Sequence, residues 1–328
     1  TDVFKKCLYL GLISFGGPMA HIGIFEQLLV NRHRYISREE FLQLLSLCKV
    51  IPGPTSSQLL TAIATIKTKS LLSGIISFLC FNVPGFIIML LAGYYASSTG
   101  FDTSYSLLFS ILATGLSQSA VAIIFQAAKS LTDGIKKSTL HLSFVAICSI
   151  IYYTFNTYAV MILLMTICGL ICIFWDKLDN KGNTEFIDKS NIPFIGTPAL
   201  ISFLVIFIFL HFLYYYIFKD LNYLLMSTFY RIGSLIIGGG HVVIPMIISE
   251  FSSYNLIKES DVLNSFSIVS LLPGPMFNLS AYIGTLINGI KGGILSWFFI
   301  FLSGMLLLFA MLGYMNRINR GVKLRLFL

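Results

Sequence analysis

The sequence predicts an all-α polytopic membrane protein, and three observations support this prediction. Of the 328 residues, 56% are hydrophobic and only 11% are charged, whereas a soluble domain carries about 25% charged residues. The apolar residues form continuous runs, and continuous rather than alternating runs favour membrane helices over a β-barrel. Basic residues gather in the short joints between those runs. We therefore expect a lipid bilayer around the chain, whose mean hydropathy is +0.84.

Four segments are long enough to cross the bilayer as uninterrupted helices, which takes about 20 apolar residues. In chain order they are Leu71–Ala96, Ser104–Ala128, Thr197–Phe218 and Ile290–Tyr314. Residues 139–175 are apolar over a length sufficient for two tight spans. The polar linker 176–196 divides the chain into a first part, 1–175, and a second part, 197–328, which we expect to be truncated at its C-terminal end.

The charge and cysteine patterns exclude several function classes. The formal net charge is +8, but the basic residues lie where cytoplasmic loops of membrane proteins carry them, so we expect no nucleic-acid binding. The six cysteines lie inside apolar segments and the five histidines are scattered. We therefore expect neither a disulfide framework nor a metal or cofactor site.

Four stretches do not fit simple spans, because glycine and proline interrupt them. Gly16-Gly17-Pro18 and Gly238-Gly239-Gly240 each break an apolar helix. Pro-Gly-Pro occurs twice, at residues 52–54 and 273–275. Around the first copy, Phe41–Ile51 and Thr55–Ile66 are each about half a membrane long. Because proline removes a backbone donor and clashes with the preceding turn, we expect a re-entrant helical hairpin here.

The four interruptions form two pairs, which predicts two homologous repeats. Gly16 precedes Pro52 by 36 residues, and Gly238 precedes Pro273 by 35. Duplicated units with paired interruptions are typical of secondary transporters whose site lies where the repeats meet. The basic joint at 31–40 and the acidic joint at 251–262 favour an inverted arrangement. Counting spans through 139–218 instead places both joints on one side, and the sequence leaves this conflict open.

The interrupted stretches resemble the chromate ion transporter family. The resemblance is carried by "FGGPMAHIG", "RHRYISREEF", "LCKVIPGPTSSQL", "GGGHVVIPMI" and "LLPGPMFNLSAYIG", within residues 4–97 and 226–313. It implies a membrane transporter of chromate, with sulfate as a related oxyanion, built from two homologous halves. It also assigns these residues to the family's motifs: Gly16, Gly17, Pro18, His21, Pro52, Gly53, Pro54, Ser56, Ser57, Gln58, Gly239, Gly240, His241, Pro273, Gly274 and Pro275. Lys49 and Ser270 stand where the family usually has Gln. The resemblance therefore determines the identity of the transported anion less well than it determines the transport function.

An oxyanion needs hydrogen-bond donors and positive potential, and a helix N-terminus supplies both. Pro54 suits the first turn of a half-helix, and Thr55 and the serines after it add hydroxyl groups. After Pro275, Asn278 supplies the corresponding polar group. The predicted substrate-binding set is Gly16, Gly17, His21, Lys49, Pro52, Gly53, Pro54, Thr55, Ser56, Ser57, Gln58, Gly239, Gly240, His241, Pro273, Gly274, Pro275 and Asn278. The alternative is structural: simple helix kinks for Pro-Gly-Pro and close helix packing for the glycines.

Charged and titratable residues near the interruptions have two interpretations each. A lysine at membrane depth is costly and usually functional, but Lys49 also has a stem long enough to reach the surface. His21, Glu26 and Glu250 are candidates for proton coupling, or else hydrogen-bonding groups near the interface. Arg231 is either a site residue or an interfacial anchor.

The predicted function is secondary-active transport of a small inorganic oxyanion, with proton coupling as an open addition. A carrier or channel for another small anion is the main alternative, and an intramembrane enzyme the weaker one. We expect a multi-pass protein of the plasma membrane, and a homodimer is the one protein partner that the sequence leaves open.

Overall fold

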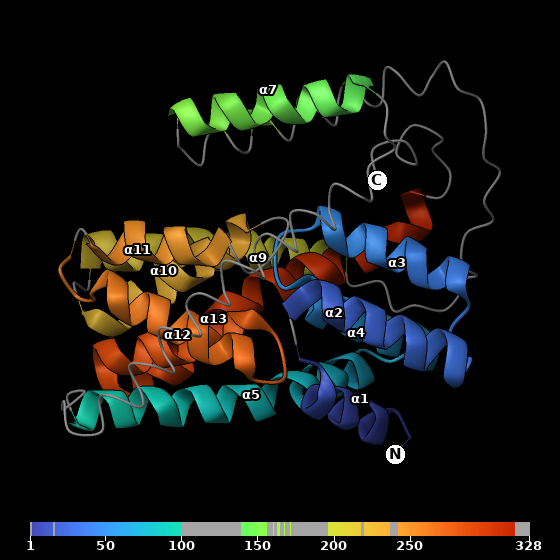
Figure 1. The fold of residues 1–328 in the computed structure, drawn as a ribbon, viewed down its shortest axis with the longest axis horizontal. Helices are drawn as coiled ribbons and strands as arrows, with labels where there is room; N and C mark the ends of the chain where they lie inside the picture. Colours follow the sequence, from blue (N-terminus) through green and yellow to red (C-terminus); the bar gives the residue numbers. More distant parts are fainter. Residues whose placement is uncertain are drawn as a thin grey trace. The chain divides into compact units, whose positions relative to one another are not determined.

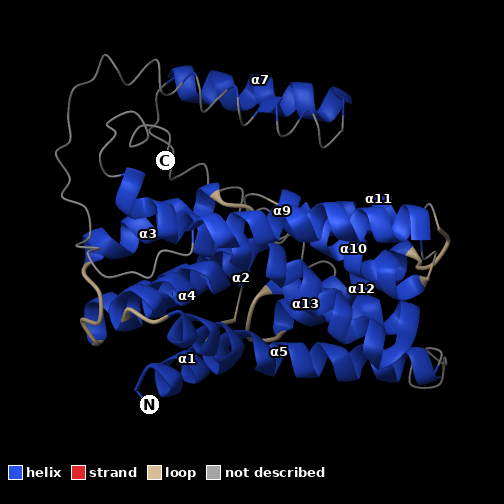
Figure 2. Ribbon diagram, turned by 180° about the vertical axis from the view of Figure 1, so that it is seen from behind, coloured by secondary structure: helices blue, strands red, loops and turns tan. Residues whose placement is uncertain are grey.

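The computed structural model describes residues 2–15, 17–99, 139–155, 196–217, 220–236, 242–252 and 254–318, with a few single residues between 160 and 171. These residues form helices joined by loops, and no strand occurs among them (Figure 2). The predicted all-α class is thus confirmed. Residues 2–99 and 196–316 belong to one compact unit, while α7 (Thr139–Phe155) belongs to a second.

Residues 2–99, here called the first half, form a series of short helices followed by one long helix (Figure 1, blue to teal). The helices are α1 (Asp2–Ile13), α2 (Gly17–Phe25), the π-helix η1 (Glu26–Arg32), α3 (Arg38–Val50), α4 (Thr55–Thr68) and α5 (Leu71–Thr99). Gly17 has a φ of +82°, a conformation that favours glycine, and α2 starts there. Residues 14–16, which separate α1 from α2, are called the first break.

Residues 196–318, here called the second half, have a similar order of elements (Figure 1, yellow to red). They are α9 (Gly196–Phe212), the π-helix η4 (Leu213–Ile217), α10 (Leu221–Leu235), α11 (Val243–Ser252), α12 (Glu259–Leu271), the 3₁₀ turn η6 (Met276–Asn278) and α13 (Leu279–Ile318). Non-helical backbone at Asn288 and Gly289 divides α13. Residues 236–242, between α10 and α11, are called the second break.

Three helices in the described part of the chain are apolar and long enough to cross a membrane: Leu71–Ser98, Gly196–Ile217 and Met276–Tyr314. The first two match predicted spans closely. The third contains the bend at Asn288 and Gly289. Its uninterrupted portion therefore begins at Ile290, which is also the start of the predicted span Ile290–Tyr314. The predicted span Ser104–Ala128 lies outside the described residues, as does most of 156–175.

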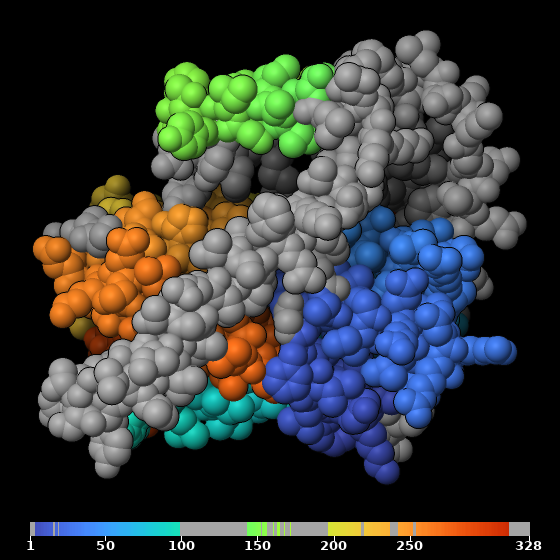
Figure 3. Space-filling model, viewed as in Figure 1, coloured from blue at the N-terminus to red at the C-terminus, as the bar shows by residue number. Residues whose placement is uncertain are grey.

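Glycines bring the helices of each half close together. α1 and α4 pack on α5, and a Cβ added to Gly11 of α1 would lie 2.6 Å from the Cys80 carbonyl oxygen. In the second half, a Cβ on Gly233 of α10 would lie 2.2 Å from the Ile300 carbonyl oxygen of α13. Small residues at such crossings let membrane helices pack backbone to backbone. Figure 3 shows the surfaces of the two halves, blue and orange, adjoining each other.

Candidate functional site

The first Pro-Gly-Pro segment, residues 51–54, forms the tip between α3 and α4 and is called the first tip. Gly53 has a φ of +122°, which any residue with a Cβ adopts only with strain. Its N–H donates to the Ile236 carbonyl at 2.8 Å, and Ile236 follows the last residue of α10. The Gln58 amide donates from Nε2 to Pro52 O at 2.8 Å and to Gly304 O at 3.0 Å. The first tip is therefore held by α10 and α13 of the second half.

The second Pro-Gly-Pro segment, residues 272–275, forms the tip that follows α12 and is called the second tip. Gly274 has a φ of +102°, and its N–H donates to the Ser14 carbonyl at 2.9 Å. Asn278 donates from Nδ2 to Asn82 O at 3.3 Å and accepts from Trp297 Nε1 at 2.8 Å. A Cβ on Gly85 of α5 would lie 2.7 Å from Pro273 O. The second tip is therefore held by α1 and α5 of the first half.

The two tips make reciprocal contacts with the two breaks. Ser14 lies just after α1, and Ile236 lies just after α10, so each carbonyl belongs to the C-terminal end of a broken helix. Such carbonyls lack an intrahelical partner, and water is scarce in the hydrocarbon region. Each tip glycine satisfies the carbonyl that belongs to the other half. Segments more than 180 residues apart in the sequence thereby meet at two junctions.

Two helix N-termini lie at these junctions. Pro54 is the N-cap of α4 and gives it no side-chain cap; the hydroxyl residues Thr55, Ser56 and Ser57 that follow are all buried. Ser57 donates from Oγ to Asn82 Oδ1 at 2.9 Å, so its hydroxyl also ties α4 to α5. At the first break, a Cβ on Gly17 would lie 3.1 Å from Met276 Cε. Met276, the first residue of η6 after the second tip, thus reaches the N-terminus of α2.

His21 and Ser14 are buried beside the first break. Neither side chain is exposed, and neither the two ring nitrogens of His21 nor Ser14 Oγ has a hydrogen-bond partner among the described residues. The imidazole packs against Phe25 and Phe81, with ring centroids at 6.4 and 5.6 Å. Because buried polar groups normally find partners, these unpaired atoms are candidates for contact with a ligand.

The charged candidates lie in different surroundings. Lys49 is exposed. Glu26 forms a surface ion pair with Arg38 at 3.4 Å, and such pairs contribute little. Glu250 of α11 pairs with Arg231 of α10, and both side chains are about one quarter exposed. This pair joins the two helices on either side of the second break.

The candidate residues thus fall into three groups. The two junctions contain Gly17, His21, residues 52–58, residues 273–275 and Asn278. The second group consists of charged side chains: Lys49 is exposed, and Glu26 and Glu250 form ion pairs. Gly16, Gly239, Gly240 and His241 lie outside the described residues. Whether any of these residues binds an anion remains a prediction.

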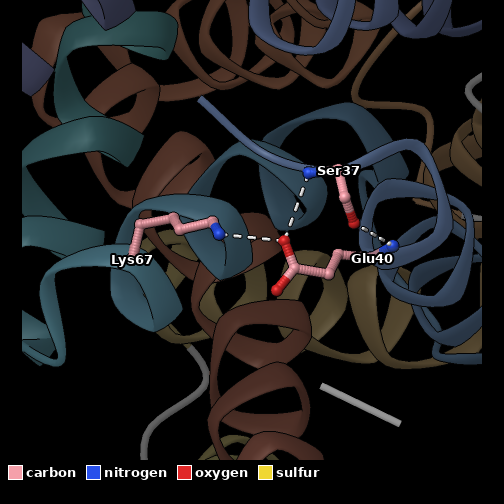
Figure 4. A network of polar contacts seen from close by, with 3 residues as sticks. All are labelled: Ser37, Glu40 and Lys67. Atoms are coloured by element: carbon pink, nitrogen blue, oxygen red, sulfur yellow. Dashed lines mark hydrogen bonds and ion pairs between the residues drawn. The ribbon is translucent and has the colours of Figure 1, made fainter. Parts of the chain in front are cut away.

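A polar network at the open end of the α3–α4 hairpin escaped the sequence reasoning (Figure 4). Ser37 and Glu40 cap the N-terminus of α3 reciprocally, at 3.1 and 3.2 Å. Lys67, at the end of α4, contacts Glu40 Oε2 at 2.8 Å. Burial raises the pKa of Glu40, but hydrogen bonds from Lys67 and Ser37 outweigh burial and hold this pKa below its ordinary value. The sequence Ser-Arg-Glu-Glu at residues 37–40 is the pattern of this cap. The contact of Lys67 with Glu40 depends on the packing of α4 beside α3, which the sequence does not show.

A small pocket lies away from the two junctions. It is lined by Lys6, Cys7, Leu29, Tyr35, Leu60, Ile63 and Ala64, and its volume is about 10 Å³. That space holds one water at most, so it has no room for an oxyanion. Among the described residues, no group of three or more metal-ligating side chains comes together.

Comparison with known proteins identifies the family. The family model for chromate transporters matches residues 1–173 and 223–328. An uncharacterized transporter of Methanocaldococcus jannaschii is 20% identical over 94% of this chain and 74% of its own length. The probable chromate transport protein of Synechococcus elongatus is 23% identical over 100% of this chain and 78% of its own. The chromate transport protein of Pseudomonas aeruginosa is 35% identical over 88 residues, which are 27% of this chain and 21% of its own. No solved structure matches the chain. This helical membrane protein therefore belongs to the chromate transporter family.

Proposed function

We propose that this protein is a secondary-active transporter of a small inorganic oxyanion of the chromate or sulfate type, located in the plasma membrane. The observation that carries the proposal is the reciprocal contact between tips and breaks, in a chain that belongs to a transporter family. Transporters built from repeats bind their substrate where the repeats meet, at interrupted helices. At the two junctions, interrupted helices from the two halves meet.

Corresponding contacts in the two halves support a repeat with inverted topology. Gly53 bonds the end of α10 and Gly274 bonds the end of α1. Gly85 and Gly304, which lie 32 and 30 residues after the tip glycines, each approach the tip of the other half. Such exchanged contacts arise naturally when two copies of one unit pack about a two-fold axis. On this proposal, α3–α4 and α12–η6 are re-entrant hairpins.

The N-termini of α2 and α4 are the donors that we assign to the oxyanion. Each offers backbone N–H groups and a partial positive charge without a formal cation, so the anion is held but is also able to leave. The Ser57 hydroxyl donates to Asn82, so we assign the α4 contribution mainly to backbone N–H groups and to Ser56. Asn278 and Gln58 hold the tips through their own amide bonds.

Uptake into proteoliposomes tests this function. Purified protein is reconstituted, and entry of labelled chromate and sulfate is followed with and without a pH gradient. Pro54→Ala, Ser56→Ala and Ser57→Ala are compared with Ser97→Ala, whose exposed hydroxyl on α5 bonds only its own helix. We expect saturable uptake that falls roughly tenfold or more in at least one tip variant and not in Ser97→Ala, since charge-assisted hydrogen bonds contribute about 1.5–3 kcal/mol.

Three outcomes would change the proposal. Full uptake in all three tip variants at equal protein levels would remove the tips from the site. Transport of another anion in place of both oxyanions would reassign the substrate. Currents far larger than a carrier supports would indicate a channel. The same reconstituted protein, cross-linked before solubilisation, tests the predicted homodimer.

A further inference from the structure

We propose that Ser14 and His21 form a closed subsite at the first break where the oxyanion and one proton bind together, with His21 carrying the proton. This inference rests on the proposed function and deepens it, because it names the co-transported ion and the residue that holds it. The observations are the unpaired buried atoms, the absence of a counter-charge among the described residues, and the second tip that closes the subsite.

The polar atoms at the first break match what a protonated oxyanion complex needs. Ser14 Oγ and both nitrogens of His21 are fully buried and unpartnered among the described residues. Helical side chains lean toward the N-terminus of their helix, so His21, four residues after Gly17, leans toward the break. The Ser14 backbone lies close to the imidazole. The Ser14 hydroxyl and the imidazole N–H are donors, and the N–H groups in the first turn of a helix such as α2 add to them.

No described charged group faces His21. α4 carries one ionisable side chain, Lys67, which pairs with Glu40. η1 carries Glu26, which pairs with Arg38, and Arg32, which is exposed. Among the described side chains of the other elements packed here, the ionisable ones are Lys5, Lys6, Cys7 and Tyr9 on α1 and Cys80, Tyr94 and Tyr95 on α5, and none acts on the imidazole through its charge. The second tip has no ionisable residue.

This environment makes proton binding depend on the anion. An imidazolium between Phe25 and Phe81 without a counter-charge would be a buried unpaired ion, which is costly. An oxyanion at the N-terminus of α2 would supply the missing negative charge. The proton comes from water on the side of entry, adds to one imidazole nitrogen, and returns to water when the anion leaves. Because coupling between two ligands is reciprocal, the anion increases proton affinity as much as the proton increases anion affinity.

The second tip closes the subsite in this conformation. Gly274 bonds Ser14 across the break, and the buried Met276 side chain reaches toward Gly17. An oxyanion therefore reaches Ser14 and His21 only when the second tip moves. Proton and anion are then sealed from water together, which is what strict coupling requires.

Proton uptake on anion binding tests the inference without a variant. Chromate or sulfate is added to the purified protein in weakly buffered detergent solution near pH 7, and protons are followed with an indicator dye. We expect about one proton taken up for each anion bound. Anion binding without proton uptake would overturn this inference and leave the proposed function intact. Neither binding nor transport of any oxyanion would instead refute the proposed function.

His21→Gln then locates the proton, because glutamine keeps a hydrogen-bonding group that cannot become charged. With membrane potential held at zero, wild-type accumulation should rise about tenfold per unit of inward pH gradient, since one proton per anion corresponds to about 1.4 kcal/mol per unit. His21→Gln should transport more slowly, and the accumulation that remains should not depend on the gradient. His33→Gln, at an exposed position, should behave as wild type. Gradient-dependent accumulation in His21→Gln would exclude His21.

Ser14→Ala provides an independent variant. Loss of its hydroxyl should weaken anion binding roughly tenfold or more, as expected for a hydrogen bond to a charged group, while one proton is still taken up per bound anion. Unchanged affinity would remove Ser14 from the subsite. If His21→Gln fails to fold, His21→Asn and the dye measurement on wild type still decide the question.

Discussion

Replacing Gly53 by alanine should destabilise the protein far more than replacing Gly289, although both glycines have a positive φ. Gly53 has a φ of +122° and Gly289 a φ of +62°. A Cβ on Gly53 would lie 2.7 Å from Gln58 Nε2 and 2.9 Å from Gly304 Cα, whereas a Cβ on Gly289 meets nothing within 4 Å. Comparing Gly53→Ala with Gly289→Ala therefore separates the cost of backbone strain from the cost of steric crowding at the first tip.

The magnitudes follow from these two contributions. A residue with a Cβ in a left-handed or rarer conformation costs about 1–3 kcal/mol, and this part acts at both positions. Overpacking adds about 1–3 kcal/mol, and at Gly53 it acts against backbone that has little freedom to move. We expect a loss of about 3–5 kcal/mol for Gly53→Ala and about 1 kcal/mol for Gly289→Ala.

Unfolding of the purified variants in mixed micelles, followed by tryptophan fluorescence, measures both losses. Trp297 is a suitable reporter because it bonds Asn278 beside the second tip. Gly304→Ala should fall between the two variants, since its Cβ would approach Gly53 Cα and Pro54 Cδ at 3.1 Å without an unfavourable φ. Equal losses for Gly53→Ala and Gly289→Ala would refute the reasoning that the first tip is closely packed on α13.

Three further predictions concern the polar contacts. The folded pKa of Glu40 lies below its ordinary value of 4.5, so its ionisation stabilises the protein, and this contribution is lost as the pH falls from about 4.5 through the folded pKa. A double-mutant cycle of Glu40→Gln with Lys67→Met, measured by unfolding, should give about 0.5–1 kcal/mol at neutral pH and progressively less as the pH falls below about 4.5. Asn278→Ala should cost about 2–4 kcal/mol because it leaves the Trp297 N–H buried without its partner. Asn222 is only half-buried and bonds Asp220 and Asn288, so Asn222→Ala should cost less, about 1 kcal/mol. Arg231→Met should cost about 1–3 kcal/mol because it leaves Glu250 without this cation, and the double variant Arg231→Met with Glu250→Met should recover part of that loss; full additivity would show that the pair contributes no coupling.

The helix ends at the tips were predictable from sequence, because local chemistry determines them. The arms expected at 41–51 and 55–66 are observed as Arg38–Val50 and Thr55–Thr68. Proline and glycine fix the ends that meet at the tip. The outer ends extend by two or three residues, because Ser37 caps α3 and Lys69 adopts a left-handed conformation after α4.

The contacts that join the halves were not predictable, because they depend on three-dimensional packing. Nothing in the sequence near Gly53 indicates that its N–H bonds Ile236, or that Ser14 accepts from Gly274. Likewise, His21 was recognisable as a candidate, but its burial between Phe25 and Phe81 depends on a helix sixty residues away. The exposure of Lys49 also depends on how α3 packs, which the local sequence does not determine.

The reciprocal contact between tips and breaks has a consequence for synthesis of the chain. Ser14 leaves the ribosome 260 residues before Gly274, which satisfies its carbonyl. At about 5–20 residues per second, that carbonyl waits roughly 10–50 s for its partner. During this time α1 and α2 are inserted beside an unfilled position. The nascent first half therefore depends on the insertion machinery, or on water kept near the break, until the second half arrives to complete it.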